Sequence, residues 1–213
     1  MDTSEPEAEM RERVEVMVAG GYLPLDQIEF DAADYLTGAY EELDDDALAA
    51  MAKRLVEVAA RSHAEEQASW PEMTDCDRLE AACASLEERG ILCGQHTGFT
   101  QGDGGSEMMD RVRREREAGR QVRGYAFFHE QDVEGAVQGG GLALAFGRVE
   151  GEANLEPDAR IGETVVEHLR EHGLTVEWNG ESRARLLVKL RWQRRRHDLP
   201  PPPRSFWRRL FNR

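Results

Sequence analysis

The chain has 213 residues, of which 40% are hydrophobic and 32% are charged, and its formal net charge is −15. This length allows one domain, or one domain with an appendage, and a sizeable buried core. The composition excludes a membrane-spanning helix, because no run approaches the roughly 18 apolar residues that a bilayer requires.

Three further features indicate a compartment. The first residues lack the basic and apolar regions of a signal peptide. The cysteines (Cys76, Cys83 and Cys93) are odd in number and form no CxxC pair. We therefore expect a cytoplasmic protein with reduced thiols.

The charge is distributed unevenly. Residues 1–90 hold 24 acidic and 7 basic residues, residues 91–184 hold 17 and 10, and residues 185–213 hold one Asp and 10 basic residues. The acidic majority argues against a nucleic-acid-binding body, and the arginine run 194–196 alone is a weak signal for one.

The first ninety residues predict helices. Apolar residues at helical spacing indicate helices at 5–18, about 26–40, and from Asp44 or Asp45 to about Ser69. A fourth helix should begin at a capping box, Thr74 to Asp77, and end at Gly90.

From Ile91 onward, short apolar runs alternate with helical segments. The expected strands are 91–96, 124–129, 141–148, 174–178 and 185–192, and the expected helices are 106–118, 132–138 and 158–172. The predicted fold class is α+β: a ferredoxin-like split βαβ sheet with one extra strand, preceded by an all-helical N-terminal extension. The predicted regions are an acidic helical region 1–73, an α+β domain 74–196, and a Pro-rich linker with a basic amphipathic tail 197–213.

Two polar loops should meet at one edge of this sheet. Strands 91–96 and 124–129 are joined by a helix, so they should run parallel and their following loops should leave the same edge. The candidate pocket residues there are His96, Thr100, Gln101, Asp103, His129, Gln131 and Asp132. Histidines beside carboxylates are suited to general acid–base chemistry or to metal binding.

Most of these residues also have a structural interpretation. A histidine at a strand end often satisfies backbone groups of the next loop, Asp132 is suited to helix capping, and Asp103 is suited to an Asp-Gly turn. Thr100 and Gln101 have no clear structural duty in a glycine-rich loop, which favours binding. The glycines would let backbone N–H groups face an anion, but their spacing matches neither a P-loop nor a dinucleotide fingerprint.

Known catalytic and metal-binding signatures are missing from the sequence. It contains no HExxH, no paired CxxC and no GxSxG. We expect no metal site and no cofactor. Cys76 and Cys83, seven residues apart on one helix face, indicate core packing, and Cys93 should be buried in a strand.

The C-terminal segment follows a polyproline spacer at residues 200–203. As a helix it would form an apolar patch beside arginines, and it is a candidate for contact with a protein partner or an anionic membrane. The tail residues concerned are Phe206, Trp207, Arg208, Arg209, Leu210 and Phe211. The alternatives are a disordered end, or one that folds back onto the acidic helices, which are themselves a candidate partner surface. The oligomeric state is open.

Several phrases resemble motifs of one family. They are TDCDRL (74–79), HTGFTQGDG (96–104), GYAFFHEQDVE (124–134), GGLALAFG (140–147) and VEWNG (176–180). This family comprises uncharacterised bacterial proteins, frequent in actinobacteria, that carry a domain of unknown function. The resemblance covers about residues 45–195, implies a bacterial origin and supplies no activity.

Two functions therefore remain open. The missing catalytic signatures, the acidic helices and the amphipathic tail favour a non-catalytic interaction or regulatory module. The alternative is a small-molecule-binding or hydrolytic enzyme that uses the His/Gln/Asp residues at the sheet edge.

Overall fold

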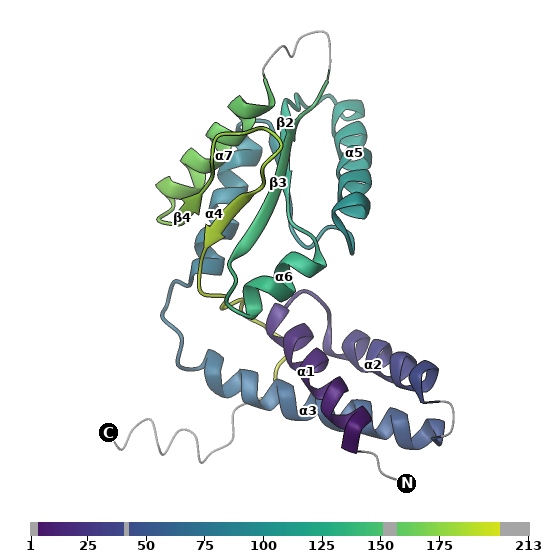
Figure 1. Cartoon of the computed structure of the whole chain (residues 1–213). Helices are drawn as coiled ribbons and strands as arrows, with labels where there is room; N and C mark the ends of the chain where they lie inside the picture. Colours follow the sequence, from purple (N-terminus) through teal and green to yellow (C-terminus); the bar gives the residue numbers. More distant parts are fainter. Residues whose placement is uncertain (1–3, 41–42, 151–156, 201–213) are drawn as a thin grey trace. The chain divides into compact units, whose positions relative to one another are not determined.

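A computed structural model describes residues 4–40, 43–150 and 157–200 of the chain (Figure 1). The chain divides into two compact units. The first unit comprises Met1–Glu72 together with Gln193–Arg213, and the second comprises Met73–Trp192.

Three helices build the first unit: α1 (Ser4–Gly20), α2 (Leu25–Ala39) and α3 (Asp45–Gln67). Each contributes apolar residues at helical spacing to a shared core, such as Met10, Val14 and Val18 from α1. The α3 helix begins where expected, because the carboxylate of Asp44 accepts the Ala47 N–H at 3.0 Å.

The chain returns to this first unit after residue 192, and Arg196 fixes the return. Arg196 is only 5% exposed, and its guanidinium donates to the Val18 carbonyl at 3.2 Å and to the Leu23 carbonyl at 2.7 Å. It also pairs with Asp198 at 2.7 Å. The Arg196 backbone exchanges hydrogen bonds of 2.8 and 2.9 Å with the Gln67 amide. One buried arginine therefore joins the turn after α1 to the end of α3.

The second unit is built around a five-stranded sheet. Its elements are α4 (Asp75–Glu88), β1 (Ile91–Gly94), α5 (Gln101–Glu117), β2 (Gly124–Phe127), α6 (Glu130–Val137), β3 (Leu142–Arg148), α7 (Asp158–Glu171), β4 (Thr175–Glu177) and β5 (Leu186–Lys189). The strand order is β1-β2-β3-β5-β4. The β1–β2 pair is parallel, as predicted, and the other pairs are antiparallel. The α+β class is confirmed. The ferredoxin-like detail is not confirmed, because β1 and β2 are direct neighbours with no strand between them.

Helices cover both faces of this sheet. Figure 1 shows α4 and α7 on one face and α5 on the other. Small residues allow the close approach: a Cβ atom at Gly124 would lie 2.7 Å from Ile161 of α7, and one at Gly104 of α5 would lie 2.5 Å from the Phe127 ring. Alternation along β2 thus gives each helix layer its own set of contacts.

Capping boxes start three of these helices, and the one at α6 is formed by His129 and Asp132. Thr74 and Asp77 form the predicted one, with the Thr74 N–H donating to Asp77 at 2.7 Å. Thr100 and Asp103 form a second one, which the sequence did not lead us to expect. As a result α5 begins at Gln101 rather than at 106, and the glycines at 102, 104 and 105 lie within the helix. The prediction of a glycine-rich loop at these residues was wrong.

The cysteines also differ from expectation. Cys83 of α4 and Cys93 of β1 form a disulfide, while Cys76 is a buried thiol outside any disulfide. The expectation of three reduced thiols is therefore wrong for two of them. The predicted burial of all three side chains is confirmed.

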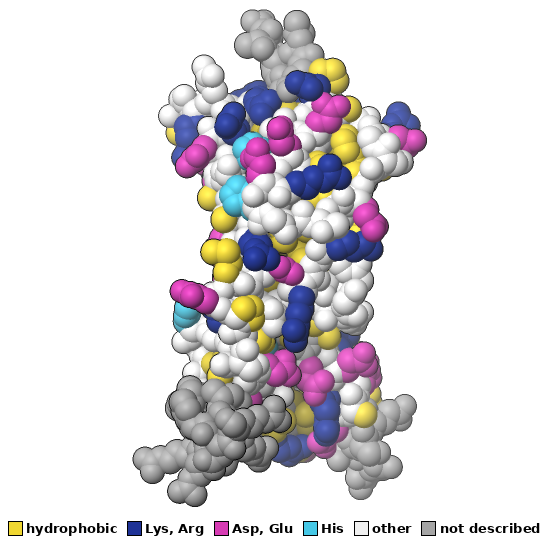
Figure 2. Space-filling view, turned by 90° about the vertical axis from the view of Figure 1, so that its left-hand side faces the viewer, with side chains coloured by type: hydrophobic (Ala, Val, Ile, Leu, Met, Phe, Trp, Pro, Cys, Tyr) yellow, Lys and Arg dark blue, Asp and Glu magenta, His cyan; other side chains and the backbone are white. Residues whose placement is uncertain are grey.

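Charges are mixed on the face drawn in Figure 2, where basic and acidic side chains are interspersed with hydrophobic ones. That pattern differs from the continuous basic stripe of a nucleic-acid-binding surface. In the described part of the chain, no helix combines the length and the apolar character needed to cross a bilayer.

Candidate functional site

The loops that follow β1 and β2 are bonded to each other. The Thr97 N–H donates to the Phe128 carbonyl at 2.9 Å, and the Glu130 N–H donates to the Gly98 carbonyl at 3.1 Å. The start of α6 thus lies against the loop that leads into α5. His96, half-buried in this loop, has a φ angle of 52°, which lies in the left-handed region that few non-glycine residues adopt.

Thr100 and Asp103 are occupied with each other. The Thr100 hydroxyl and N–H donate to one Asp103 carboxylate oxygen at 2.7 and 3.1 Å, and the Asp103 N–H donates back to the hydroxyl at 3.3 Å. The bonds from the Thr100 side chain and backbone lower the pKa of Asp103. The sequence interpretation that Thr100 has no structural duty was wrong. A carboxylate of the chain itself already occupies the N-terminus of α5, where an external anion was considered.

His129 and Asp132 are buried and form a polar cluster with Arg185, whose side chain is 28% exposed. His129 and Asp132 are 5% and 7% exposed. One Asp132 oxygen lies 3.0 Å from the His129 backbone nitrogen, 3.2 Å from His129 Nε2 and 2.5 Å from an Arg185 Nη atom. Arg185 donates further to the Ala143 carbonyl at 2.8 Å. This carboxylate therefore joins the end of β2, the first turn of α6 and the residue before β5.

Burial determines the protonation of His129. Its pKa is lowered, chiefly by desolvation, with a smaller lowering by Arg185, and the attraction of Asp132 opposes this only in part. The imidazole is therefore neutral near pH 7. Its buried Nδ1 atom has no hydrogen-bond partner among the described residues.

This cluster has one of the two features of a histidine general base: a carboxylate beside the imidazole, but no accessible ring nitrogen. A carboxylate orients the imidazole, as in catalytic pairs. However, the same carboxylate is shared with Arg185, and the free ring nitrogen is buried, where a substrate proton would be out of hydrogen-bond reach. Gln101 and Gln131, at the starts of α5 and α6, are exposed. The cluster's evident role is to close the turn between β2 and α6.

A cavity of about 650 Å³ lies elsewhere in this unit, between α5 and strands β2 and β3. Its lining residues are Met109, Val112, Arg113, Arg116, Glu117, Tyr125, Arg148, Val149, Glu150 and Asp158. Tyr125 lies near the start of β2 and Arg148 ends β3, so the cavity is at the opposite end of these strands from His129.

The lining of this cavity is mixed: Met109, Val112 and Val149 are apolar, and most of the other lining residues are charged. Arg116 is fixed, because it donates to the Glu150 and Val122 carbonyls at 2.8 and 3.2 Å. Arg148 is held more loosely: its guanidinium lies 3.5 Å from a Glu150 oxygen and 3.8 Å from an Asp158 oxygen. Both distances exceed a good N–H···O hydrogen bond, so with respect to the described carboxylates Arg148 keeps donors for another acceptor.

Tyr125 adds a neutral hydroxyl to this lining. Desolvation raises its pKa, and the nearby carboxylate of Asp158 raises it further, so the phenol stays protonated and able to donate. Three arginines face three carboxylates in the lining, and the local charge is balanced. The cavity is therefore suited to a partly apolar molecule with a polar or anionic end.

None of the seven candidate pocket residues is among those that line this cavity. Sequence reasoning missed it because its walls come from α5 and from two antiparallel strands. One local signal existed: Arg113 and Arg116 are three apart and share a helix face. The sequence alone does not show that Tyr125 and Arg148 lie near these arginines, because this depends on the strand register, in which Tyr125 pairs with Gly147.

The structure also locates the arginine run that stands out in the sequence. Each arginine of the run 194–196 has a partner in the first unit: Arg194 stacks on the Tyr22 ring at 4.0 Å, Arg195 donates to the Pro71 and Glu72 carbonyls, and Arg196 is buried. Across the described residues, no three His, Cys, Asp or Glu side chains are grouped as metal ligands would be. The tail residues Phe206, Trp207, Arg208, Arg209, Leu210 and Phe211 lie outside the described residues, and their partner role stays a prediction.

Comparisons with known proteins give a family but no activity. No curated protein matches the chain, and no solved structure matches it. One family model, described as a domain of unknown function (DUF6891), matches residues 3–196, which extends the resemblance to the first helices. The chain belongs to this family of proteins with a domain of unknown function.

Proposed function

We propose that this protein is a non-catalytic binding module, and that the cavity beside α5 holds a small molecule with an anionic group on an apolar body. The observation that carries this proposal is the contrast between the two ends of strands β1 to β3. At the His129 end the carboxylates are occupied by internal partners, whereas the cavity combines the apolar side chains of Met109, Val112 and Val149 with the loosely held Arg148.

The dimensions of the cavity support this function. Ligand pockets commonly have volumes of about 300–1,000 Å³, and the volume of this cavity, about 650 Å³, lies within that range. Met109, Val112 and Val149 would contact the apolar body of the ligand. The Arg148 guanidinium would turn from Glu150 toward a carboxylate or phosphate, which it can bind through two parallel hydrogen bonds, and Tyr125 would donate a third.

The balanced charge of the lining sets an expectation for affinity. A ligand anion competes with Glu150 and Asp158 for Arg148. Because the lining has no net charge, long-range attraction adds little to the affinity for the anion. Most of the affinity should come from apolar contact, and it should depend only weakly on salt.

The experiment is isothermal titration calorimetry of the full chain with phenyl phosphate and with benzoate as probes. We expect at least one of them to bind, and we expect Arg148→Ala to weaken that binding tenfold or more, since a charged hydrogen bond contributes about 1.5–3 kcal/mol. Arg160→Ala is the matched control, because Arg160 is an exposed arginine of the same unit that pairs only with Glu163 among the described residues. Equal loss in both variants, or no binding of either probe, would refute the proposal.

A hydrolytic site at the His129 end is the competing function. The His129–Asp132 pair favours it, and the buried Nδ1 atom disfavours it. Hydrolysis of p-nitrophenyl acetate by the wild type that His129→Gln abolishes would support that alternative over the binding module.

A further inference from the structure

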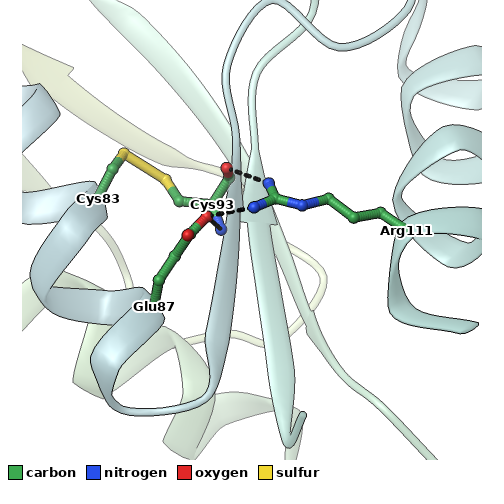
Figure 3. Close-up of a disulfide and its surroundings, with 4 residues drawn as sticks. All are labelled: Cys83, Glu87, Cys93 and Arg111. Carbon is green, nitrogen blue, oxygen red and sulfur yellow. Dashed lines mark hydrogen bonds and ion pairs between the residues drawn. A yellow bond between two sulfur atoms is a disulfide. The ribbon is translucent and has the colours of Figure 1, made fainter. Parts of the chain in front are cut away.

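We propose that the disulfide between Cys83 and Cys93 is a redox-sensitive clasp that holds α5 against β1 (Figure 3). The clasp itself stands on contacts that are independent of the proposed function. Its consequence for ligand binding rests on that function, because α5 forms one wall of the cavity.

Four side chains from three elements make up the clasp. The disulfide joins α4 to β1, and Glu87 follows Cys83 by one turn of α4. A Glu87 oxygen accepts the Cys93 N–H at 3.3 Å and an Arg111 Nη atom at 2.6 Å. The other Nη atom of Arg111, which belongs to α5, donates to the Cys93 carbonyl at 2.8 Å. Figure 3 shows Glu87 and Arg111 meeting at the backbone of Cys93.

The position of Cys93 in the sheet explains why Glu87 and Arg111 bond to its backbone. Strand β1 is at the edge of the sheet. The carbonyls of Gly90 and Gly94 bond to the β2 side, to Gly124 and Phe128, so the backbone groups of Cys93 between them face away from β2. Glu87 and Arg111 satisfy the donor and the acceptor that a further strand would otherwise pair.

The α5 helix depends on such polar anchors. Its buried residues are Gly104, Met108 and Val112, which is a small apolar face for 17 residues. Arg111 holds its middle to β1, and Arg116 holds its last turn to Val122 and Glu150. Reduction of the disulfide frees Cys93 from α4. The Arg111 anchor then loses the covalent bond that holds its acceptor, Cys93, in place.

The chemistry is a two-electron exchange. A small dithiol transfers two electrons and two protons to the disulfide, so the Cys83–Cys93 bond breaks, two thiols form, and the dithiol becomes a cyclic disulfide. A low-molecular-weight disulfide reverses the reaction and leaves as two thiols. The side chains are 3% and 6% exposed, so exchange requires a small reagent or local opening. Cys76 lies seven residues before Cys83, roughly 10 Å along the helix, and does not compete.

The test compares the full chain in its oxidised form and after treatment with dithiothreitol, without ligand. Alkylation and mass spectrometry should count one reactive thiol in the unfolded oxidised chain and three after reduction. Hydrogen exchange of amides in 101–117 should then become about tenfold faster in the reduced protein, as expected when between one and two kcal/mol of local stability is lost. Amides of α7, on the other face of the sheet, should change less.

Two variants make the result decisive. Cys76→Ser keeps the clasp and should show the full response to reduction. Cys83→Ser should exchange at the fast rate in both conditions; if it fails to fold, the reduced wild type supplies the same comparison. Three free thiols after incubation with oxidised glutathione, or unchanged exchange in α5 on reduction, would overturn the inference. Because no probe is present, failure of the cavity to bind phenyl phosphate leaves this result unaffected.

Discussion

A single oxygen of Asp132 accepts from the His129 backbone, lies within reach of the His129 ring, and accepts from Arg185. Sharing one acceptor among three donors stabilises the ionised carboxylate in a buried place, which otherwise would cost several kcal/mol. The two capping boxes in this part of the sheet differ in this respect, because Asp103 is exposed and serves only Thr100 and its helix.

Replacing these two carboxylates should therefore have unequal effects. Asp132→Asn leaves the guanidinium of Arg185 without its charged partner and should lower the free energy of unfolding by about 3–5 kcal/mol. Asp103→Asn, the matched control at the equivalent capping position, should cost clearly less. Urea denaturation of both variants measures the difference, and equal losses would show that Asp132 acts as a cap alone.

The buried imidazole of His129 gives the protein a pH dependence. Its pKa is lowered from 6.5 by burial, so the unfolded chain binds more protons than the folded chain in mildly acidic solution. Its contribution to stability is fully present above about pH 6.5 and is lost as the pH falls through the folded-state pKa. Denaturation midpoints between pH 5 and 7.5 should fall less steeply in His129→Gln than in the wild type, whereas parallel profiles would contradict this assignment.

Residue-level features could be predicted only where the partners are close in sequence. The Thr74–Asp77 box was predicted from its spacing and confirmed. The Thr100–Asp103 box has the same spacing, but the flanking glycines favoured a loop, since glycine is a poor helix former. The link from Asp132 to Arg185 spans 53 positions and has no local signal.

At the level of elements, arginines from the helices bond to both edge strands of the sheet. Arg111 of α5 donates to the Cys93 carbonyl on β1, and Arg170 of α7 donates to the Val176 carbonyl on β4 at 3.0 Å. Unpaired backbone groups on an edge strand are sites for pairing with a second chain, and charged side chains that cover them oppose it. The sheet therefore ends in two short, covered strands.

Removing one cover should promote association. Arg170→Ala exposes the Val176 carbonyl on β4, and we expect a larger apparent mass at high concentration in light scattering. Arg160→Ala, on the same helix, should stay like the wild type. An unchanged mass for Arg170→Ala at all concentrations would show that the short length of β4 alone prevents pairing.

The types of most elements follow from hydrophobic periodicity, and the parallel β1–β2 pair follows from its helical crossover. The sheet order did not follow, because β3, β4 and β5 are joined by connections that fit several antiparallel orders. The cavity depends on that order and on register, so it was beyond the reach of local patterns.

At the scale of the molecule, the chain closes its first unit with residues from both ends of the sequence. Arg196 contributes the central contact, and its side chain is buried among backbone carbonyls. The segment that contains it was predicted to belong to the α+β region, from residue 74 to 196, on the basis of sequence order alone. The described contacts of Arg196 are with Val18, Leu23, Gln67 and Asp198.

Loss of this side chain should destabilise the first unit. Arg196→Met keeps much of the volume but leaves the Val18 and Leu23 carbonyls without these donors, at about 1–3 kcal/mol each. Arg194→Met, whose stacking on Tyr22 is nearer the surface, is the control and should cost less. Hydrogen exchange in α1 and α3 measures the effect, and protection equal to that of the wild type would contradict the role assigned to Arg196.

The most direct test of the binding function is an amide NMR titration of the ¹⁵N-labelled full chain with phenyl phosphate. We expect saturable shift changes at the cavity residues of α5, at Tyr125 and at residues 148–150, and little change at His96, Asp103, His129 and Asp132. Changes centred on the His129 end, or none at saturating concentration, would contradict it.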